Sequence, residues 1–523
     1  MSNRKLIKST SIIGSATTAS RILGFIRDIM LARFFGTNIF AQAFVVAFRL
    51  PNMLRDMVGE GATDAAIVPI LTEYRHTRPE KEYWEAARVI LNLMLMVLIT
   101  LSVLGVLFSP VLVRLIAPGF VVTPEKFRIT VDLTRWLFPY ILFLGLVAYC
   151  KGVLSSFNYF TTPAFSPVIL NMAMITSLVF LCPVYGVKGI VAGVLGGGVL
   201  EVLIQVPPLV KRGFRLEGVF RIAHPIASRI GKLLLPRALG TAVYQMSVFV
   251  DTILASLSSV VGAGGVAALY YSNRLVQLPL AVFGISLATA VLPRLSREAA
   301  TRDMNAFRDT VAFSLRTVFT IMMPAIFGLM ILAEPMMRIL FQRGEFTAYS
   351  TGITSAALFY YSFGLFAYAG IKILVSAYYS MGDTKTPVKT ASVSLLVNIV
   401  LNLILMWPLK IGGLALATSI AAITNFIILY ILLARRIGDP GTKGLALATM
   451  KMLLAAGVMS VFTCYMKARF LQGGAGGSLI KSIVTLVGTV IASGGVYVVS
   501  AYFIGVPGVR RITGLLRDRM PSS

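Results

Sequence analysis

Residues 17–73 read TTASRILGFIRDIMLARFFGTNIFAQAFVVAFRLPNMLRDMVGEGATDAAIVPILTE. Apolar residues fill most of two helix-length segments here, near 9–33 and 40–58. Charged residues nevertheless lie inside these segments or at their ends: Arg21, Arg27, Asp28, Arg55 and Glu60. Each arginine or aspartate in the centre of a membrane costs about 2.5–3.5 kcal/mol on insertion scales. We therefore expect these side chains to face a helix bundle or a water-filled cavity.

The first segment carries its charges over a broad sector. At 100° per residue, Arg21 and Asp28 lie on one face of a helix, and Arg27 lies about 120° away. Neighbouring helices must enclose this sector. We interpret it as a binding surface for an anionic substrate within the membrane. The pattern leaves two roles open for Asp28, as an ion-pair partner of Arg21 or as a group that meets the substrate.

Composition sets the class of protein. Of 523 residues, 57% are hydrophobic and only 13% are charged, whereas soluble domains carry about 25% charged residues. Apolar segments of about 20 residues recur from end to end, which is typical of a polytopic membrane protein. The formal net charge is +27, but the basic residues fall mostly in loops. They indicate orientation and contact with anionic membrane lipids, and we expect no nucleic-acid partner.

Hydropathy predicts fourteen spans with short connections. They lie near 9–33, 40–58, 87–108, 131–157, 164–182, 187–210, 232–257, 265–292, 310–333, 351–380, 386–407, 411–434, 445–466 and 480–504. Lysine and arginine gather in alternate loops, at the N-terminus and in the C-terminal tail. Basic loops stay in the cytoplasm, so both termini are expected there.

An internal repeat organises the spans. Prolines, glycines and charged residues recur at an offset near 224, as in Thr162-Pro163 with Thr386-Pro387 and in Asp28 with Asp251. Six spans per copy give both copies the same orientation, as in parallel-repeat transporters. The predicted fold is all-α and polytopic, with fourteen transmembrane helices: two pseudo-symmetric six-helix lobes plus two extra C-terminal helices. The expected divisions are 1–229 for the N-lobe, 230–436 for the C-lobe, and 437–523 for the C-terminal pair with its basic tail.

The two copies differ in chemistry. Arg21 and Arg27 align with Tyr244 and Val250, so the first lobe is basic where the second is not. The second lobe instead offers Arg274. Two lobes facing one another would place four arginines around one cavity: Arg21, Arg27, Arg55 and Arg274. Planar guanidinium groups suit bidentate recognition of phosphate.

Four motifs carry a resemblance to a known family: SRILGFIRDIMLARFFG, AFRLPNMLRDMVGEGATDAAIVPILTEY, YYSNRLVQLP and DTKTPVK. Over essentially its whole length the chain resembles the MurJ (MviN) family of lipid II flippases, in the MOP exporter superfamily. The resemblance implies two six-helix lobes, a C-terminal pair lining a hydrophobic groove, and outward movement of lipid-linked disaccharide-pentapeptide across the bacterial inner membrane.

The same resemblance assigns residues. The family's cavity arginines match the four named above, and its neighbouring aspartate and EGA segment match Asp28 and Glu60-Gly61-Ala62. An acidic residue that some members carry is replaced here by Gln42. A sodium site in the second lobe would use Asp251 and, as a further candidate, Asp383. We expect a monomer with no other cofactor.

Other functions fit the sequence less well. A polysaccharide exporter of the same superfamily would also move a polyprenyl diphosphate, whereas a multidrug exporter for cationic drugs would favour an acidic cavity. An intramembrane enzyme acting on lipid phosphates would need a base or nucleophile near the arginines, and His76 and His224 both fall in loops. A passive channel fits a repeat with an off-centre charge cluster less well than a carrier does.

Overall fold

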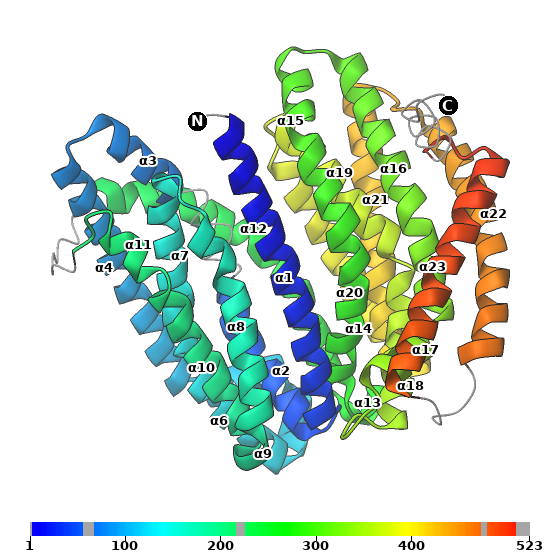
Figure 1. Ribbon diagram of the computed structural model, residues 1–523, viewed down its shortest axis with the longest axis horizontal. Helices are drawn as coiled ribbons and strands as arrows, with labels where there is room; N and C mark the ends of the chain where they lie inside the picture. Colours follow the sequence, from blue (N-terminus) through cyan, green and yellow to red (C-terminus); the bar gives the residue numbers. More distant parts are fainter. Residues whose placement is uncertain (1–2, 56–66, 216–224, 472–477, 509–523) are drawn as a thin grey trace. The chain divides into compact units, whose positions relative to one another are not determined.

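The computed structural model describes residues 3–55, 67–215, 225–471 and 478–508, and every regular element within them is helical. By internal contacts the chain divides into two compact units, residues 1–257 and 258–523. Figure 1 colours the first unit from blue to green and the second from green to red. The prediction of an all-helical polytopic protein is confirmed at this level.

The first unit begins with the charged helix and ends with another of similar length. Its elements are α1 (Asn3–Phe35), α2 (Ile39–Arg55), α3 (Val68–Thr77), α4 (Glu80–Leu107), α5 (Ser109–Ile116), the 3₁₀ segment η2 (Pro118–Val122), α6 (Pro124–Leu137), α7 (Tyr140–Ser156), α8 (Thr161–Phe180), α9 (Cys182–Tyr185), α10 (Val187–Leu203), α11 (Val206–Val210) and α12 (Pro225–Ser256).

The second unit contains the remaining helices. Its elements are α13 (Ser258–Val261), α14 (Gly265–Pro279), the π-helical segment η3 (Leu280–Ile285), α15 (Ser286–Ala300), α16 (Met304–Ile331), α17 (Ala333–Phe341), α18 (Ala348–Ser362), α19 (Leu365–Ser380), α20 (Lys385–Leu409), α21 (Ile411–Ile437), α22 (Thr442–Met466), the π-helical segment η4 (Lys467–Leu471) and α23 (Leu479–Ile504).

Many of these helices are long enough to cross a membrane. Within the described residues, ten helical stretches are long and apolar enough, or eleven if α18 and α19, bent by 46°, form one span. The stretch from Gly265 to Ala300 is continuous although it contains Pro279 and Pro293. Prolines are tolerated in such helices because neighbouring groups satisfy the freed backbone atoms.

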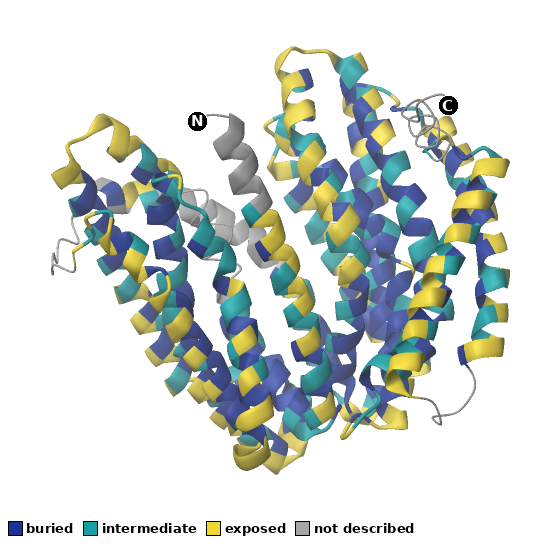
Figure 2. Ribbon diagram, viewed as in Figure 1, coloured by how far each residue is buried: buried dark blue, intermediate teal, exposed yellow. Residues whose placement is uncertain are grey.

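Helices related by the predicted repeat pack in similar pairs within each unit. The packing of α2 on α6 in the first unit corresponds to that of α14 on α18 in the second. The packing of α8 on α10 corresponds to that of α20 on α21, and α1 also packs on α8. The buried side chains face these seams, while outward positions of helices such as α23 are exposed and apolar (Figure 2). That distribution is expected where lipid rather than water covers the outer surface.

Helix α12 is fastened to the first unit near both of its ends. Near its start, Ile226 is 1% exposed and joins a core cluster with Trp84, and Arg229 forms a two-pronged ion pair with Glu73 at 3.0 and 2.6 Å. The hydrogen bond from Arg229 lowers the pKa of Glu73. At its far end, Ser256 Oγ accepts a hydrogen bond of 3.0 Å from the backbone N–H of Gly119.

Candidate functional site

The centre of the candidate site is a buried ion pair on α1. Arg27 is 8% exposed and Asp28 is 1% exposed. Arg27 donates from Nε and from Nη2 to Asp28 Oδ1, at 3.1 and 2.8 Å. Adjacent residues on a helix point 100° apart, but the long arginine side chain reaches across this angle. Asp28 therefore pairs with Arg27, the preceding residue, and not with Arg21, which the helical spacing had offered as a partner.

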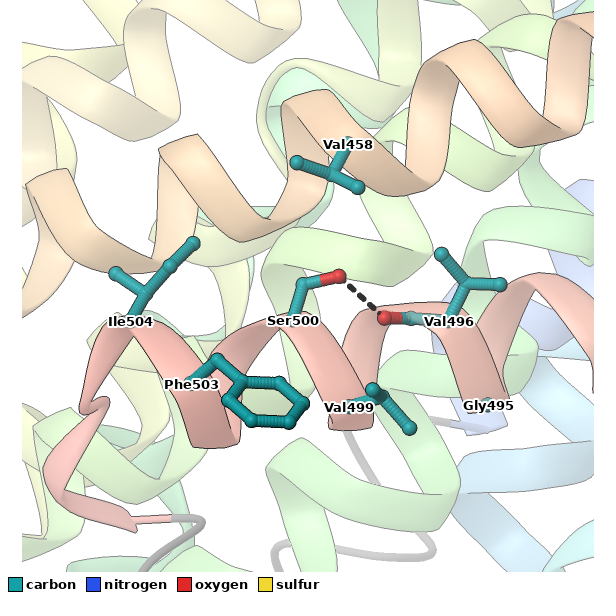
Figure 3. Close-up of a pocket in the computed structure, with 7 residues that line it drawn as sticks. All are labelled: Val458, Gly495, Val496, Val499, Ser500, Phe503 and Ile504. Carbon is teal, nitrogen blue, oxygen red and sulfur yellow. Dashed lines mark hydrogen bonds between the residues drawn. The ribbon is translucent and has the colours of Figure 1, made fainter.

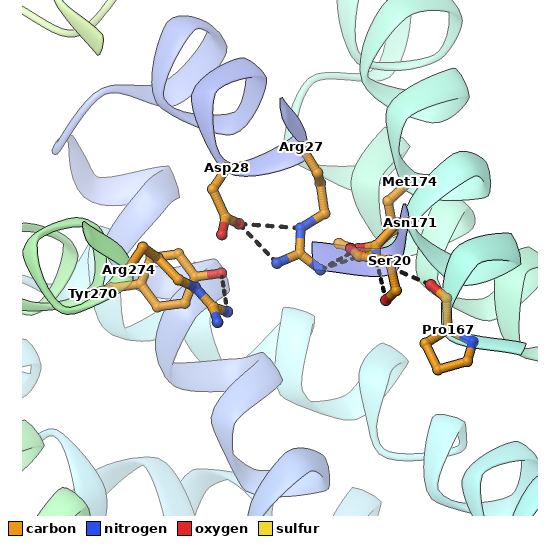
Figure 4. A network of polar contacts seen from close by, with 8 residues as sticks. All are labelled: Ser20, Arg27, Asp28, Pro167, Asn171, Met174, Tyr270 and Arg274. Carbon is orange, nitrogen blue, oxygen red and sulfur yellow. Dashed lines mark hydrogen bonds and ion pairs between the residues drawn. The ribbon is translucent and has the colours of Figure 1, made fainter. Parts of the chain in front are cut away.

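A third residue, Asn171 of α8, completes the network (Figure 4). Its Oδ1 accepts a hydrogen bond of 3.0 Å from Arg27 Nη1. Its Nδ2 donates to the backbone oxygens of Ser20 and Pro167 at 3.1 and 2.9 Å, so the amide is held in one orientation. Asn171 thus connects α1 to α8 and directs an acceptor at Arg27. Sequence analysis missed it, although an amide inside an apolar span was an available signal.

The other charged residues of the N-terminal stretch are placed differently. Arg21 lies on α1 with an exposed side chain. Arg55 is the last residue of α2, and its side chain lies outside the described residues, as does all of Glu60. Their convergence with Arg27 stays a prediction.

Arg274 belongs to the second unit. It lies on α14, is half-buried, and donates a hydrogen bond of 2.9 Å to the hydroxyl of Tyr270 one turn earlier. Its guanidinium carbon also lies 4.7 Å from the centre of the Tyr270 ring. The tyrosine supports the guanidinium by both contacts. Whether Arg274 shares a cavity with the arginines of the first unit stays a prediction.

The two aspartates suggested for sodium have different surroundings. Asp251 lies on α12 and is 8% exposed. Asp383 precedes α20, accepts hydrogen bonds from the backbone N–H groups of Lys385 and Thr386, and pairs with Arg436 at 2.7 Å. The N–H of Thr386 is the main reason that the pKa of Asp383 is lowered. Among the described residues, no group of three or more acidic, histidine or cysteine side chains could hold a metal ion.

A second buried cation lies elsewhere in the first unit. Lys126 of α6 is 4% exposed, donates a hydrogen bond of 3.0 Å to Gln42 Oε1, and lies 3.7 Å from the centre of the Phe120 ring. The amide of Gln42 supplies a neutral acceptor. This pairing was also missed, because Lys126 and Gln42 are 84 residues apart.

The helix pair α22 and α23 forms an apolar groove of about 640 Å³ (Figure 3). Seven residues line it: Val458, Gly495, Val496, Val499, Ser500, Phe503 and Ile504. The hydroxyl of Ser500 is turned back onto the backbone oxygen of Val496, so it offers no donor to a ligand. A hydrocarbon chain suits such a lining.

The fold is that of a transporter. A solved multidrug transporter of the MATE family and MOP superfamily, in an inward-facing conformation, aligns with 84% of this chain and 96% of its own, with a TM-score of 0.62 at 17% identity. At that identity the likeness shows the fold alone. Together with the long apolar helices it defines a multi-pass membrane protein that shares this transporter's fold.

More specific comparisons give the family. The family model described as lipid II flippase MurJ matches residues 31–485. The lipid II flippase MurJ of Burkholderia cenocepacia is 32% identical over 437 residues, covering 82% of this chain and 84% of its own. A solved lipid II flippase MurJ in an inward closed conformation gives a TM-score of 0.77 at 26% identity and covers 93% of this chain and 98% of its own. The chain belongs to the lipid II flippase MurJ family, and it is therefore a transporter of peptidoglycan precursor rather than an enzyme or a multidrug exporter.

Proposed function

We propose that this chain moves lipid II from the cytoplasmic to the outer leaflet by alternating access, with arginines holding the diphosphate. The buried network of Arg27, Asp28 and Asn171 carries this proposal. Burying a guanidinium within a membrane protein is costly, and here two side chains, those of Asp28 and Asn171, orient the guanidinium of Arg27. A guanidinium held in this way suits a group that must bind a phosphate at a defined depth in the membrane.

The proposal includes the finer architecture. Helices α1, α2 and α12 complete fourteen spans when they are added to the eleven stretches counted above. The divisions remain 1–229, 230–436 and 437–523, with the first two as pseudo-symmetric lobes. The similar helix pairings within the two units support that arrangement. Both termini lie in the cytoplasm of a bacterium, and the protein works as a monomer in the inner membrane among anionic lipids.

Binding would proceed by an exchange of counter-ions. In the described state Asp28 neutralises Arg27. A diphosphate first meets the exposed Arg21 and then replaces Asp28 as the partner of Arg27. Arg55, Glu60 and Arg274 would complete the site when the two lobes enclose the head group. Because the arginines compensate the charge of the substrate, the step avoids carrying a bare dianion through the membrane.

The lipid tail needs a different environment from the head group. The groove between α22 and α23 is apolar along its length, and we place the polyprenyl chain there while the lobes rock. The membrane potential, negative inside, favours outward movement of an anion by about 2.3 kcal/mol per charge per 100 mV. Pairing with arginines reduces the charge moved, so this figure is an upper bound.

Sodium binding would reset the empty carrier. Of the two candidates we favour Asp251, which is buried on α12, whereas Asp383 is held by Arg436 and by the start of α20. An Asp251→Ala variant should lose the sodium dependence of transport, while Asp383→Ala should keep it. An unchanged sodium response in Asp251→Ala would remove the ion site from the mechanism.

The test of the arginine site is a leaflet-access assay in proteoliposomes. Arg27→Ala and Arg274→Ala should abolish flipping of lipid II while the protein remains folded and inserted. Arg33→Ala is the matched control, because Arg33 lies on α1 with an exposed side chain and belongs to no described network. Wild-type flipping by either test variant would overturn the proposed site.

A further inference from the structure

The apolar groove has a charged mouth. Its lining ends at Ile504, the last residue of α23. The next residue, Gly505, presents its backbone oxygen to Lys451 Nζ of α22 at 3.4 Å. An ammonium group has three N–H donors, and this long contact engages one of them. Within the described part of the chain, no second acceptor engages Lys451 beside the end of the groove.

The position of Lys451 follows from the spacing of α22. Gly444, Lys451 and Val458 are each seven residues apart, so they lie on one face of the helix with a rotation of about 20° between them. Val458 is part of the groove lining. Lys451 therefore lies about 10 Å further toward the start of α22, in line with the groove.

A second cation, Arg316 of α16, reaches the same face of α22. A Cβ atom on Gly444 would lie 2.7 Å from Arg316 Nη2, and one on Gly441 would lie 3.3 Å from it. The guanidinium thus lies close to the backbone at the start of α22. Its Nε is buried and has no hydrogen-bond partner within the described part of the chain.

The three helices meet at this point. Thr320, one turn along α16 from Arg316, lies 3.8 Å from the sulfur of Met452, which follows Lys451. Its hydroxyl would be 3.0 Å from a Cβ on Gly508, just beyond α23. The nearby carboxylate of Asp439 is engaged by the N–H groups of Gly441 and Thr442, at 3.1 and 2.8 Å.

We propose that Arg316 and Lys451 form a head-group site that takes the phosphate of a single-chain polyprenyl phosphate lipid at the mouth of the groove. The inference rests on the proposed role of the groove as the place of the lipid tail. It adds a station at which the lipid is held by its phosphate before that phosphate reaches the arginines of the transport site. Charge complementarity selects an anion, and the apolar lining selects a lipid over a free phosphate.

Direct binding tests this station without transport. The full-length protein carrying Arg27→Gln and Arg274→Gln is placed in phosphatidylcholine nanodiscs, and binding of undecaprenyl diphosphate is measured. Arg316→Gln and Lys451→Gln should each weaken the residual binding roughly tenfold, the scale of one charge-assisted contact. Lys481→Gln is the matched control, since Lys481 is an exposed lysine near the other end of α23.

Competition experiments distinguish a polyprenyl phosphate from free diphosphate and from an ordinary anionic lipid. Inorganic diphosphate and phosphatidylglycerol should compete weakly, and Lys451→Arg should restore binding to Lys451→Gln. Residual binding that is equal in all variants would overturn the station, as would equal competition by either anion. These outcomes leave the proposed transport site intact, because that site is tested separately by flipping in Arg27→Ala.

Discussion

Replacing Asp28 by asparagine tests the exchange of counter-ions on α1. The substitution keeps the shape of the side chain and one acceptor oxygen, but it removes the charge that neutralises Arg27. Both residues are nearly inaccessible. Removing one partner of a buried ion pair costs about 3–5 kcal/mol, because the other charge is left uncompensated. Without ligand, Asp28→Asn should therefore be markedly less stable than the wild type.

The ligand should reverse this loss. In the wild type a diphosphate must displace Asp28, whereas in Asp28→Asn it supplies the missing negative charge. We expect the variant to bind undecaprenyl diphosphate at least roughly tenfold more tightly. Ligand-linked stabilisation follows the ratio of ligand concentration to Kd, reaching about 2.7 kcal/mol at one hundred times Kd. The thermal shift at a fixed ligand concentration should thus be larger in the variant, and flipping should be slower because release is impaired.

Thermal unfolding in detergent, with and without undecaprenyl diphosphate, measures both effects. Glu201→Gln is the matched control, because Glu201 is a buried carboxylate of the same unit that accepts a hydrogen bond from Ser166. Its ligand shift should equal that of the wild type. A ligand shift in Asp28→Asn no larger than the wild-type shift would refute the exchange.

Three further predictions concern stability, each measured by unfolding of the purified protein. Gln42→Leu should destabilise by about 1–3 kcal/mol because the buried ammonium of Lys126 loses its acceptor, whereas Gln42→Leu combined with Lys126→Met should recover most of that loss. Gly119→Ala should destabilise, since its Cβ would lie 2.1 Å from a carbonyl oxygen of α12, while Gly494→Ala, with open space around it, should not. Asp383→Ala should cost about 1 kcal/mol at neutral pH; because the folded pKa of Asp383 is lowered, this difference should fade only as pH drops below 3.8, the usual value.

Apolar runs of membrane length are a local property of the sequence, so they predicted the membrane class and most spans. The family was predicted from the motifs. The run predicted at 445–466 corresponds to α22, and that at 480–504 to α23. Breaks within spans were harder to predict. The predicted span 351–380 is divided into α18 and α19, which are bent by 46°. Hydropathy does not predict such a bend, because it carries no information about neighbouring helices.

The candidate site was predicted only in part. The cost of burying charge identified Arg27 and Asp28, and the structure places both in one network. Helical spacing offered Arg21 as one possible partner of Asp28 and did not suggest Arg27, since spacing ignores how far an arginine side chain reaches. Asn171 lies 144 residues from Arg27, and such a contact depends on which helices pack together. A single sequence carries no direct record of that choice.

The predicted boundary of the repeat and the boundary between the two compact units differ by one helix, and this difference affects how the chain can be divided. By sequence α12 opens the second copy, yet its contacts at Ile226 and Ser256 belong to the first unit. Only Leu257 separates α12 from α13. If the gene were expressed as two pieces, a cut after residue 257 would keep α12 with the helices that it packs against. A cut at residue 229 would keep Ile226 with the first unit but would separate that unit from the rest of α12, including Ser256, which accepts a hydrogen bond from Gly119, so the shorter piece should be less stable.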